Sequence, residues 1–341
     1  MTRNFCTYFD TFYLPRGLAL YRSLLAHAGP FRLWVLCLDN EAHDILTKLA
    51  YPEIIPLHLE ELEHGDAPLV QAKGNRSRVE YYFTLTPILP RWILTNSSDV
   101  EMITYIDADL YFFSDLTPLF DELGGGPVMI IEHRFPPRLK AKGFERVGRF
   151  NVGWLTFRNN REGLACLERW REQCIEWCYD RTEDGKFADQ KYLDDWPGEF
   201  PSLVILQHPG GNVAPWNAEN YLFRSSGNGA VTVDGTPLIF YHFQGLKHLA
   251  GPVYESGFGM YKTRLPRVVR THVYRPYLQA LAEIIDEVRE RTGFDAEART
   301  RRLRHRPTLL AKVKGMLEFV RDVIFRRTFI IHQGRAGERH G

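Results

Sequence analysis

The sequence predicts an α/β fold with a mostly parallel, doubly wound central sheet. Three observations predict it. The first hundred residues alternate short β-rich runs with helical patterns, as βαβ units do. The chain has 341 residues and 44% hydrophobic content, enough for one large α/β domain or two small ones. Finally, no internal repeat or low-complexity linker divides it.

The expected elements follow from apolar periodicity and from turn residues. The β-rich runs predict strands at Asn4–Phe9, Phe31–Leu38, Glu53–Leu59 and Met102–Ile106. Apolar residues at helical spacing predict helices at Pro15–Ala28, Glu41–Leu49, Arg78–Leu94, Glu162–Tyr179 and Pro276–Arg291. The segment Pro209–Asn217 is too rich in Gly and Pro for regular structure.

Cysteine usage and hydropathy indicate the compartment. Five cysteines, an odd number in a chain too long to need stapling, argue against a disulfide framework. The first residues lack the uninterrupted apolar stretch of a signal peptide, and no window reaches the roughly eighteen apolar residues of a membrane span. We therefore expect a cytoplasmic protein, peripheral at most to the inner face of the membrane.

The formal net charge of +1 conceals an asymmetry. Residues 299–341 carry twelve Lys/Arg and three Asp/Glu, which gives +9 and leaves −8 for residues 1–298. Within this tail, residues 309–325 show apolar positions at helical spacing with basic residues between them. This pattern predicts a basic amphipathic helix and contact with an anionic membrane surface through residues 299–327. The alternative is a helix packed on the main domain; the acidic body does not favour nucleic acid as a partner.

The most informative motif is Asp107-Ala108-Asp109, at the end of the apolar strand Met102–Ile106. Ligands of open α/β sheets bind outside the carboxyl ends of the strands, where two nearby carboxylates can share a divalent cation that holds a diphosphate. The competing interpretation is a solvated turn. Far downstream, His242, Gly245 and Lys247 follow another β-rich run. They offer an imidazole ligand, close backbone approach to a phosphate, and a point charge for a diphosphate.

Five separated segments, in order over roughly residues 5–250, resemble the metal-dependent nucleotide-sugar glycosyltransferases of the GT-A fold, most closely the retaining enzymes of family 8. They are Asp10-x-x-Tyr13 with the helix through Ser23-Leu24, the Asp-x-Asp strand with Asp115–Phe120, Phe150–Gly153, Asp189-Gln190, and the His242, Gly245 and Lys247 motif. The resemblance implies transfer of a sugar from a nucleoside diphosphate-sugar, UDP-sugar above all, to an acceptor hydroxyl with retention of configuration.

The resemblance also implies a role for each matched residue. Asp107, Asp109 and His242 would hold Mn²⁺ or Mg²⁺, and the imidazole favours Mn²⁺. Asp189 and Gln190 would be catalytic, near the sugar and its anomeric carbon, although Asp189 could instead cap a helix. The donor-binding set comprises Tyr8, Asp10, Tyr13, Arg78, Asp107, Ala108, Asn151, Gly245 and Lys247. Trp216 and Asn217 are the acceptor candidates, because flat aromatic faces stack on sugars; a packed loop with a core tryptophan is the alternative.

The chain departs from the family pattern at three places. Thr84 stands where the family commonly has an arginine, for which Arg78 or Lys73 could substitute. Lys191 replaces a frequent second Asp after Asp-Gln, and His248-Leu249 replace a common Pro-Trp. These changes bear on which sugar is transferred and leave the metal and diphosphate residues in place.

The expected organisation is a GT-A catalytic domain over residues 1–260 and a helical, basic extension over 261–341. The nucleotide-binding half would span about 1–120 and the sugar and acceptor half about 121–260. The acceptor would be a glycan, lipid-linked or at the cell surface. Two other functions stay open: a nucleotidyltransferase, and a non-catalytic GT-A-like protein that binds membrane or nucleic acid through its tail. A nucleotidyltransferase usually has a Gly-rich basic loop after its first strand, and residues 10–17 lack one.

Overall fold

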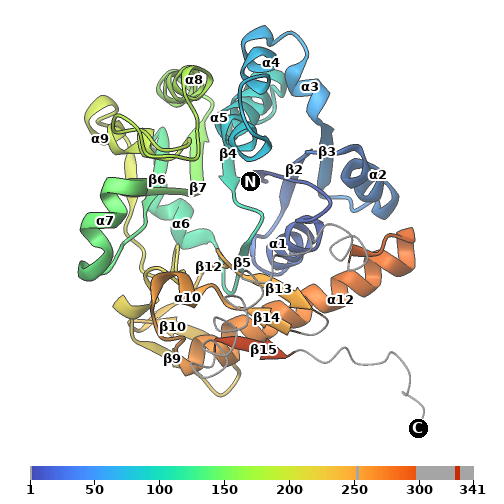
Figure 1. The fold of residues 1–341 in the computed structure, drawn as a ribbon, viewed down its shortest axis with the longest axis vertical. Coiled ribbons are helices and arrows are strands. Elements are labelled where there is room, and N and C mark those ends of the chain that lie inside the picture. Colours follow the sequence, from blue (N-terminus) through green and yellow to red (C-terminus); the bar gives the residue numbers. More distant parts are fainter. Residues whose placement is uncertain (1, 251–252, 297–326, 331–341) are drawn as a thin grey trace, which may run out of the picture.

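The computed structural model describes residues 2–250, 253–296 and 327–330. A seven-stranded sheet in the order β3-β2-β1-β4-β7-β6-β8 runs through the molecule (Figure 1). Its strands are β1 (Arg3–Phe9), β2 (Phe31–Cys37), β3 (Ile54–His58), β4 (Met102–Ile106), β6 (Val128–Glu132), β7 (Phe150–Arg158) and β8 (Val204–Leu206). Only β7 runs antiparallel to its neighbours. The structure confirms the predicted α/β class and mostly parallel sheet.

Helices cover both faces of this sheet, and each face has its own hydrophobic core (Figure 1). On one face lie α3 (Leu59–Glu63), α4 (Ala67–Lys73), α5 (Arg78–Asn96) and α8 (Arg161–Glu176). The other face is covered by α1 (Leu14–His27), α2 (Asn40–Leu49), α6 (Thr117–Leu123) and α12 (Arg275–Thr292). Side chains alternate between the two faces along each strand, so one strand contributes to both cores. In β1, Phe5 and Phe9 pack in the core under α1 and α12, whereas Cys6 packs in the core under α5 and α8.

Smaller elements complete the fold. Three small sheets pair β5 (Leu110–Phe112) with β12 (Phe240–His242), β9 (Phe223–Ser225) with β10 (Val231–Val233) and β11 (Thr236–Pro237), and β13 (Lys247–Ala250) with β14 (Val253–Glu255) and β15 (Thr328–Ile330). The remaining α-helices are α7 (Pro137–Val147), α9 (Trp196–Glu199), α10 (Phe258–Tyr261) and α11 (Arg267–Val269). Short 3₁₀ turns lie at Lys191–Asp194 and Ala218–Asn220, and a π-helical turn at Arg270–Tyr274 leads into α12.

Most of the expected elements are present with small changes at their ends. The helix predicted to reach Tyr179 ends at Glu176, where Trp177 adopts an extended backbone. All five cysteines are buried and free, as expected. The predicted amphipathic helix at residues 309–325 lies outside the described residues. In the described ranges, none of the helices has the length and apolar content that a membrane crossing requires.

Candidate active site

The Asp-x-Asp motif lies in the turn between β4 and β5. The buried strand β4 ends at Ile106, so the turn begins at Asp107. The backbone N–H of Asp107 donates to Gly153 O on the neighbouring strand β7 at 3.1 Å. β5 then pairs antiparallel with β12, in a register that sets His242 opposite Leu110. The side chain of His242 therefore lies beside both carboxylates, although more than 130 positions separate them in the sequence.

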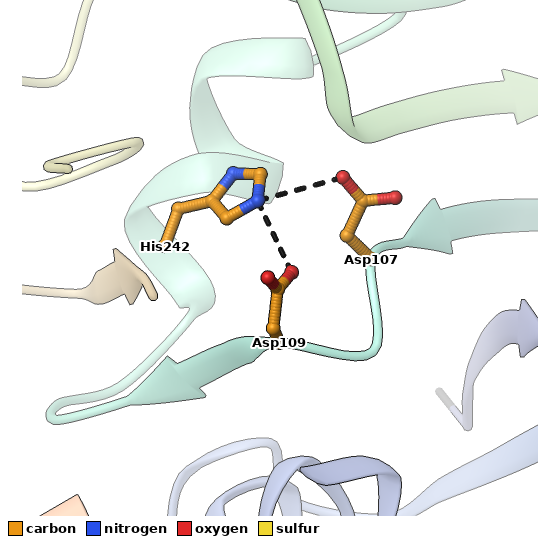
Figure 2. A group of neighbouring side chains, drawn as sticks. All are labelled: Asp107, Asp109 and His242. Atoms are coloured by element: carbon orange, nitrogen blue, oxygen red, sulfur yellow. Dashed lines mark ion pairs between the residues drawn. The ribbon is translucent and has the colours of Figure 1, made fainter. Parts of the chain in front are cut away.

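The three side chains converge on one point (Figure 2). Nε2 of His242 is 3.1 Å from Oδ1 of Asp109 and 3.6 Å from Oδ2 of Asp107, and one ligand atom from each residue lies within 4.8 Å of the others. Nδ1 of His242 makes no hydrogen bond to any described residue, so Nε2 provides the polar contacts of the ring. Two carboxylate oxygens and one imidazole nitrogen fit a divalent ion of the Mn²⁺ or Mg²⁺ type.

The electrostatics of this cluster favour a cation. Burial, together with the neighbouring Asp109, raises the pKa of Asp107. Burial acts in the same direction on Asp109, but His242 and Arg16 lower the pKa of that carboxyl overall. Burial acts to lower the pKa of His242, yet the two carboxylates raise it. The imidazole thus supplies, when protonated, part of the positive charge that a metal ion would bring.

Gly153 on β7 makes room for this arrangement. A Cβ at this position would lie 2.7 Å from Oδ1 of Asn151 and 2.9 Å from Nδ1 of His242. Any side chain would therefore displace the imidazole or the amide. The Phe150–Gly153 segment needs a glycine at its last position for this steric reason.

Arg16 is a residue of this site that the sequence analysis missed. It lies in the first turn of α1, where one guanidinium nitrogen donates to Leu246 O at 2.7 Å and another is 4.0 Å from Oδ2 of Asp109. Its guanidinium also lies over the ring of Tyr13, 4.5 Å from the centroid. The sequence signal was present, since Arg16 follows the Asp10-x-x-Tyr13 motif directly, but the contact depends on the distant Leu246.

A pocket of about 1090 Å³ opens beside the cluster and is lined by Asp107, Ala108, Asp109 and His242. Its other walls come from the β1–α1 turn, the beginning of α5, one face of α7, the Phe187–Gln190 segment and α10. A pocket of this size can hold a ligand larger than a single sugar. The cluster is thus positioned to act on a bound molecule.

The nucleotide-side candidates gather at one end of this pocket. Tyr8, Asp10, Tyr13 and Arg78 all line it. Oδ1 of Asp10 accepts from the backbone N–H of Tyr13 at 3.2 Å, and its Oδ2 accepts from Arg78 at 2.6 Å. The hydroxyl of Tyr8 contacts Thr86 Oγ1 at 3.1 Å. The ion pair between Asp10 and Arg78 ties the first strand–helix turn to the start of α5.

The sugar-side candidates form a buried group in the lining of the same pocket. Nδ2 of Asn151 donates to Oε1 of Gln190 at 3.1 Å, and Nε2 of Gln190 donates to Val147 O at 2.8 Å. Asp189 is 2% exposed, and burial, with a contribution from Asp107, raises its pKa to about 7. Gln190, not Asp189, is the residue before the 3₁₀ turn, and no side-chain cap is formed there. The helix-cap alternative for Asp189 is therefore wrong.

The two acceptor candidates differ in position. Trp216 lines the pocket but is 2% exposed; its Nε1 donates to His133 O at 2.7 Å and its ring packs edge-on against His242. Asn217 is fully buried, and its amide is used by the backbone of His133, Asn212 and Ala214. The expected acceptor contact of Asn217 is corrected accordingly: this side chain holds the loop behind the pocket wall.

The diphosphate candidates Gly245 and Lys247 do not line the pocket. Gly245 has φ +75°, and a Cβ there would lie 2.7 Å from Sδ of Met260, so glycine lets the chain pass close to α10. Nζ of Lys247 is 3.8 Å from Oε2 of Glu255 across the β13–β14 pair. In this conformation the ammonium faces a strand partner rather than the pocket.

The departures from the family pattern also have structural explanations. Thr84 is buried and its hydroxyl donates to Glu80 O within α5. Of its two substitutes, Arg78 lines the pocket, whereas Lys73 pairs with Glu63 at 2.7 Å and does not. Lys191 donates to Phe144 O and Glu145 O at the end of α7.

Comparison with known proteins places this fold and this family. The crystal structure of the galactosyltransferase LgtC with donor and acceptor sugar analogs covers 84% of this chain and 99% of its own, with TM-score 0.52 and 15% identity. The fold is that of the GT-A glycosyltransferases.

In sequence, the uncharacterized proteins YfnD and YfnF of Bacillus subtilis (strain 168) are 33% and 30% identical to this chain. Each comparison covers 84% of this chain, with 91% of YfnD and 94% of YfnF. The chain belongs to the family of YfnD and YfnF. No protein-family model matches it.

Proposed function

We propose that this protein is a metal-dependent glycosyltransferase that moves a sugar from a UDP-sugar, or another nucleoside diphosphate-sugar, to an acceptor hydroxyl. The observation that carries the proposal is the convergence of Asp107, Asp109 and His242 on one point in the lining of the pocket. The main barrier of such a reaction is departure of the diphosphate, so the site must stabilise developing negative charge.

The three clustered side chains would hold the ion, with Mn²⁺ favoured over Mg²⁺ because one ligand is an imidazole. When bound, the divalent ion supplies Lewis-acid stabilisation of the diphosphate. Asp107 is oriented for this by the hydroxyl of Tyr105, which donates to its Oδ1 at 2.9 Å. Arg16 faces the same charge from the α1 side, 4.0 Å from Asp109.

On the nucleotide side, Tyr8, Asp10, Tyr13 and Arg78 would bind the base and ribose. The ring of Tyr13, 43% exposed and supported on one face by Arg16, offers a stacking surface for a base. Binding there would leave the sugar pointing toward β7. Gly245 and Lys247 would contact the diphosphate only after a rearrangement of the chain around β13 that moves the Lys247 ammonium away from Glu255.

On the sugar side, Asn151, Asp189 and Gln190 would surround the transferred sugar. The amides of Asn151 and Gln190 orient each other, which holds the Gln190 side chain in one position near the anomeric carbon. Asp189 would accept hydrogen bonds from sugar hydroxyls. The family 8 resemblance supports retention of configuration for this transfer.

The acceptor is proposed to be a lipid-linked or cell-surface glycan, with Trp216 in its pocket wall. Residues 1–260 would be the catalytic domain and 261–341 a basic extension. The charge of +9 on residues 299–341 supports a location in the cytoplasm at the inner face of an anionic membrane, reached through residues 299–327.

The test is a thermal-shift screen of the full chain against nucleotide sugars, with and without Mn²⁺. We expect stabilisation by one nucleotide sugar that requires Mn²⁺ and is reversed by a chelator, followed by slow release of UDP, because water can replace the acceptor. A nucleotidyltransferase would instead bind a nucleoside triphosphate with release of pyrophosphate. The absence of any shift with the whole panel would refute the proposal.

A further inference from the structure

The helix α7 forms one wall of the pocket without being part of the core. None of its side chains is buried. Five of its residues nevertheless line the pocket, at the spacing of a single helical face: Leu139, Lys142, Gly143, Arg146 and Val147. A helix that buries none of its own side chains but presents one face to a cavity contributes that face to ligand contacts rather than to the core, which points to a role in binding.

A row of aromatic rings connects this helix to the metal cluster. Gly143 lies so close to Phe135 that a Cβ there would be 2.6 Å from the ring, and Phe135 stacks on His133 with centroids 4.6 Å apart. His133 packs edge-on against Trp216, which packs in the same way against His242. The pocket-facing side of α7 is therefore fixed relative to the reaction centre.

The cations on this face are unpaired. Of the three Arg and Lys residues that line the pocket, Arg78 is paired with Asp10 at 2.6 Å. Lys142 and Arg146 have no ion pair with an acidic side chain anywhere in the described ranges. Away from this face, Arg138 of the same helix does find an acidic partner, Glu219. Two unpaired cations facing one cavity attract an anion to it.

The position of α7 separates these cations from the nucleotide side. α7 connects β6 to β7, whereas Tyr8, Asp10 and Arg78 belong to β1, the turn after it and α5. In the order of the sheet, β4 with the Asp-x-Asp turn lies between β1 and β7. The nucleotide of the donor would occupy the β1 side, and its sugar would lie near Asn151 and Gln190, beside the end of α7. The cations of α7 then lie on the sugar and acceptor side of the pocket, away from the nucleotide.

We propose that Lys142 and Arg146 bind an anionic group, a phosphate or a carboxylate, on the acceptor. This inference rests on the proposed glycosyltransferase function and specifies its acceptor as negatively charged. The guanidinium of Arg146 suits a bidentate contact with either group, and the ammonium of Lys142 adds a second charge.

The experiment measures binding of defined probes by calorimetry to the full chain saturated with UDP and Mn²⁺. The probes are hexose 6-phosphates and hexuronates of gluco, galacto and manno configuration, each compared with its neutral hexose. We expect at least one anionic probe to bind about tenfold more tightly than its neutral parent, which corresponds to about 1.4 kcal/mol. The class of that probe distinguishes a phosphate from a carboxylate.

The variant Lys142→Gln with Arg146→Gln should remove this preference, while Lys140→Gln, which removes one positive charge from α7 outside this pocket, should keep it. Equal binding of anionic and neutral probes to the wild type, no binding of any anionic probe, or a preference that survives in the double variant would each overturn the inference.

UDP affinity in Mn²⁺ separates this inference from the function on which it rests. We expect the double variant to match the wild type within about twofold; a tenfold loss would assign the two cations to the donor and overturn the inference. If the wild type does not bind UDP, the proposed function fails, and the same probe titrations without nucleotide still decide whether Lys142 and Arg146 form an anion site.

Discussion

Two walls of the pocket differ in the groups that surround their carboxylates. The metal wall contains Asp107, Asp109 and His242, and the sugar wall contains Asn151, Asp189 and Gln190. On the metal wall, Asp109 lies 3.1 Å from His242 and 4.0 Å from Arg16, and these cations lower its pKa in spite of burial. On the sugar wall, Asp189 is 2% exposed, and its Oδ2 accepts no hydrogen bond from any described residue; burial raises its pKa to about 7, although a hydrogen bond with Thr86 acts to lower it.

This difference indicates what each wall is arranged to bind. A carboxylate held ionised among positive groups fits a site that receives a metal ion and a diphosphate. A buried oxygen without a donor is costly in the free protein, and a bound hydroxyl would satisfy it. We infer that Asp109 binds a cation through its negative charge and that Asp189 accepts a hydrogen bond from a neutral ligand.

The largest expected effect separates the two roles directly. Asp109→Asn should abolish Mn²⁺-dependent binding of UDP and lower turnover by about 10³-fold or more, because it removes a ligand of the ion that stabilises the leaving group. Asp189→Asn should keep UDP affinity in Mn²⁺ within about threefold while losing turnover. Calorimetry with UDP and an assay of UDP release measure both quantities.

Thermal unfolding controls for the integrity of both variants. If Asp189→Asn loses UDP binding as severely as Asp109→Asn, the proposed difference between the two walls is wrong, because both carboxylates would then act as one charged site.

The second prediction concerns pH. The native pKa of Asp189, about 7, lies above the value of roughly 3.9 expected in the unfolded chain. Between pH 4 and pH 7 the unfolded chain therefore loses this proton while the native protein keeps it, so stability falls as pH rises. Asp189→Asn should gain stability relative to the wild type over this range, by up to about 4 kcal/mol, and the gap should be constant above pH 7.

Urea unfolding of both proteins at pH 4.5, 6 and 8 measures this gap. Parallel stability curves for wild type and variant would show that Asp189 titrates normally, and the proposed contrast between the two walls would lose its electrostatic basis.

The sequence predicted the parts of the molecule that local pattern determines. The βαβ alternation gave the parallel half of the sheet, and an apolar strand that ends in Asp107 and Asp109 placed two carboxylates at its carboxyl end. His242 was predicted as a third ligand from its chemistry and from the family resemblance, but no local pattern placed it beside the two carboxylates. The physical cause is the register of β12 on β5, which no local pattern encodes.

Tertiary contacts explain the residues that sequence reasoning misplaced or missed. The sequence indicates that Asn217 is a polar loop residue, but its side-chain amide donates to the carbonyl of His133, which is remote in the sequence. Lys247 reads as a phosphate ligand, yet the β13–β14 pairing sets it near Glu255. The helix α7 was not predicted at all, because it follows the Pro136-Pro137 turn directly and five of its eleven residues are charged, so it lacks the apolar content of a core helix.

The smallest expected effect tests how the sugar wall is held. Lys191 donates to Phe144 O at 3.0 Å and to Glu145 O, so its ammonium satisfies carbonyls in the last turn of α7 and faces the negative end of that helix. We expect Lys191→Met to lower the free energy of unfolding by about 1 kcal/mol and Lys191→Asp by about 2 kcal/mol, because a carboxylate would repel the same carbonyls.

Lys140→Met is the matched control for this prediction, since the Lys140 ammonium lies over the Phe144 ring and reaches no carbonyl of α7. Proteolysis of the native chain should show faster cleavage within α7 for both Lys191 variants and not for the control. Unchanged stability in Lys191→Asp would mean that the hydrogen bonds from Gln190 to Val147 O and from Thr182 to Arg146 O suffice to hold the last turn of α7. An Asp at this position would then be compatible with this helix.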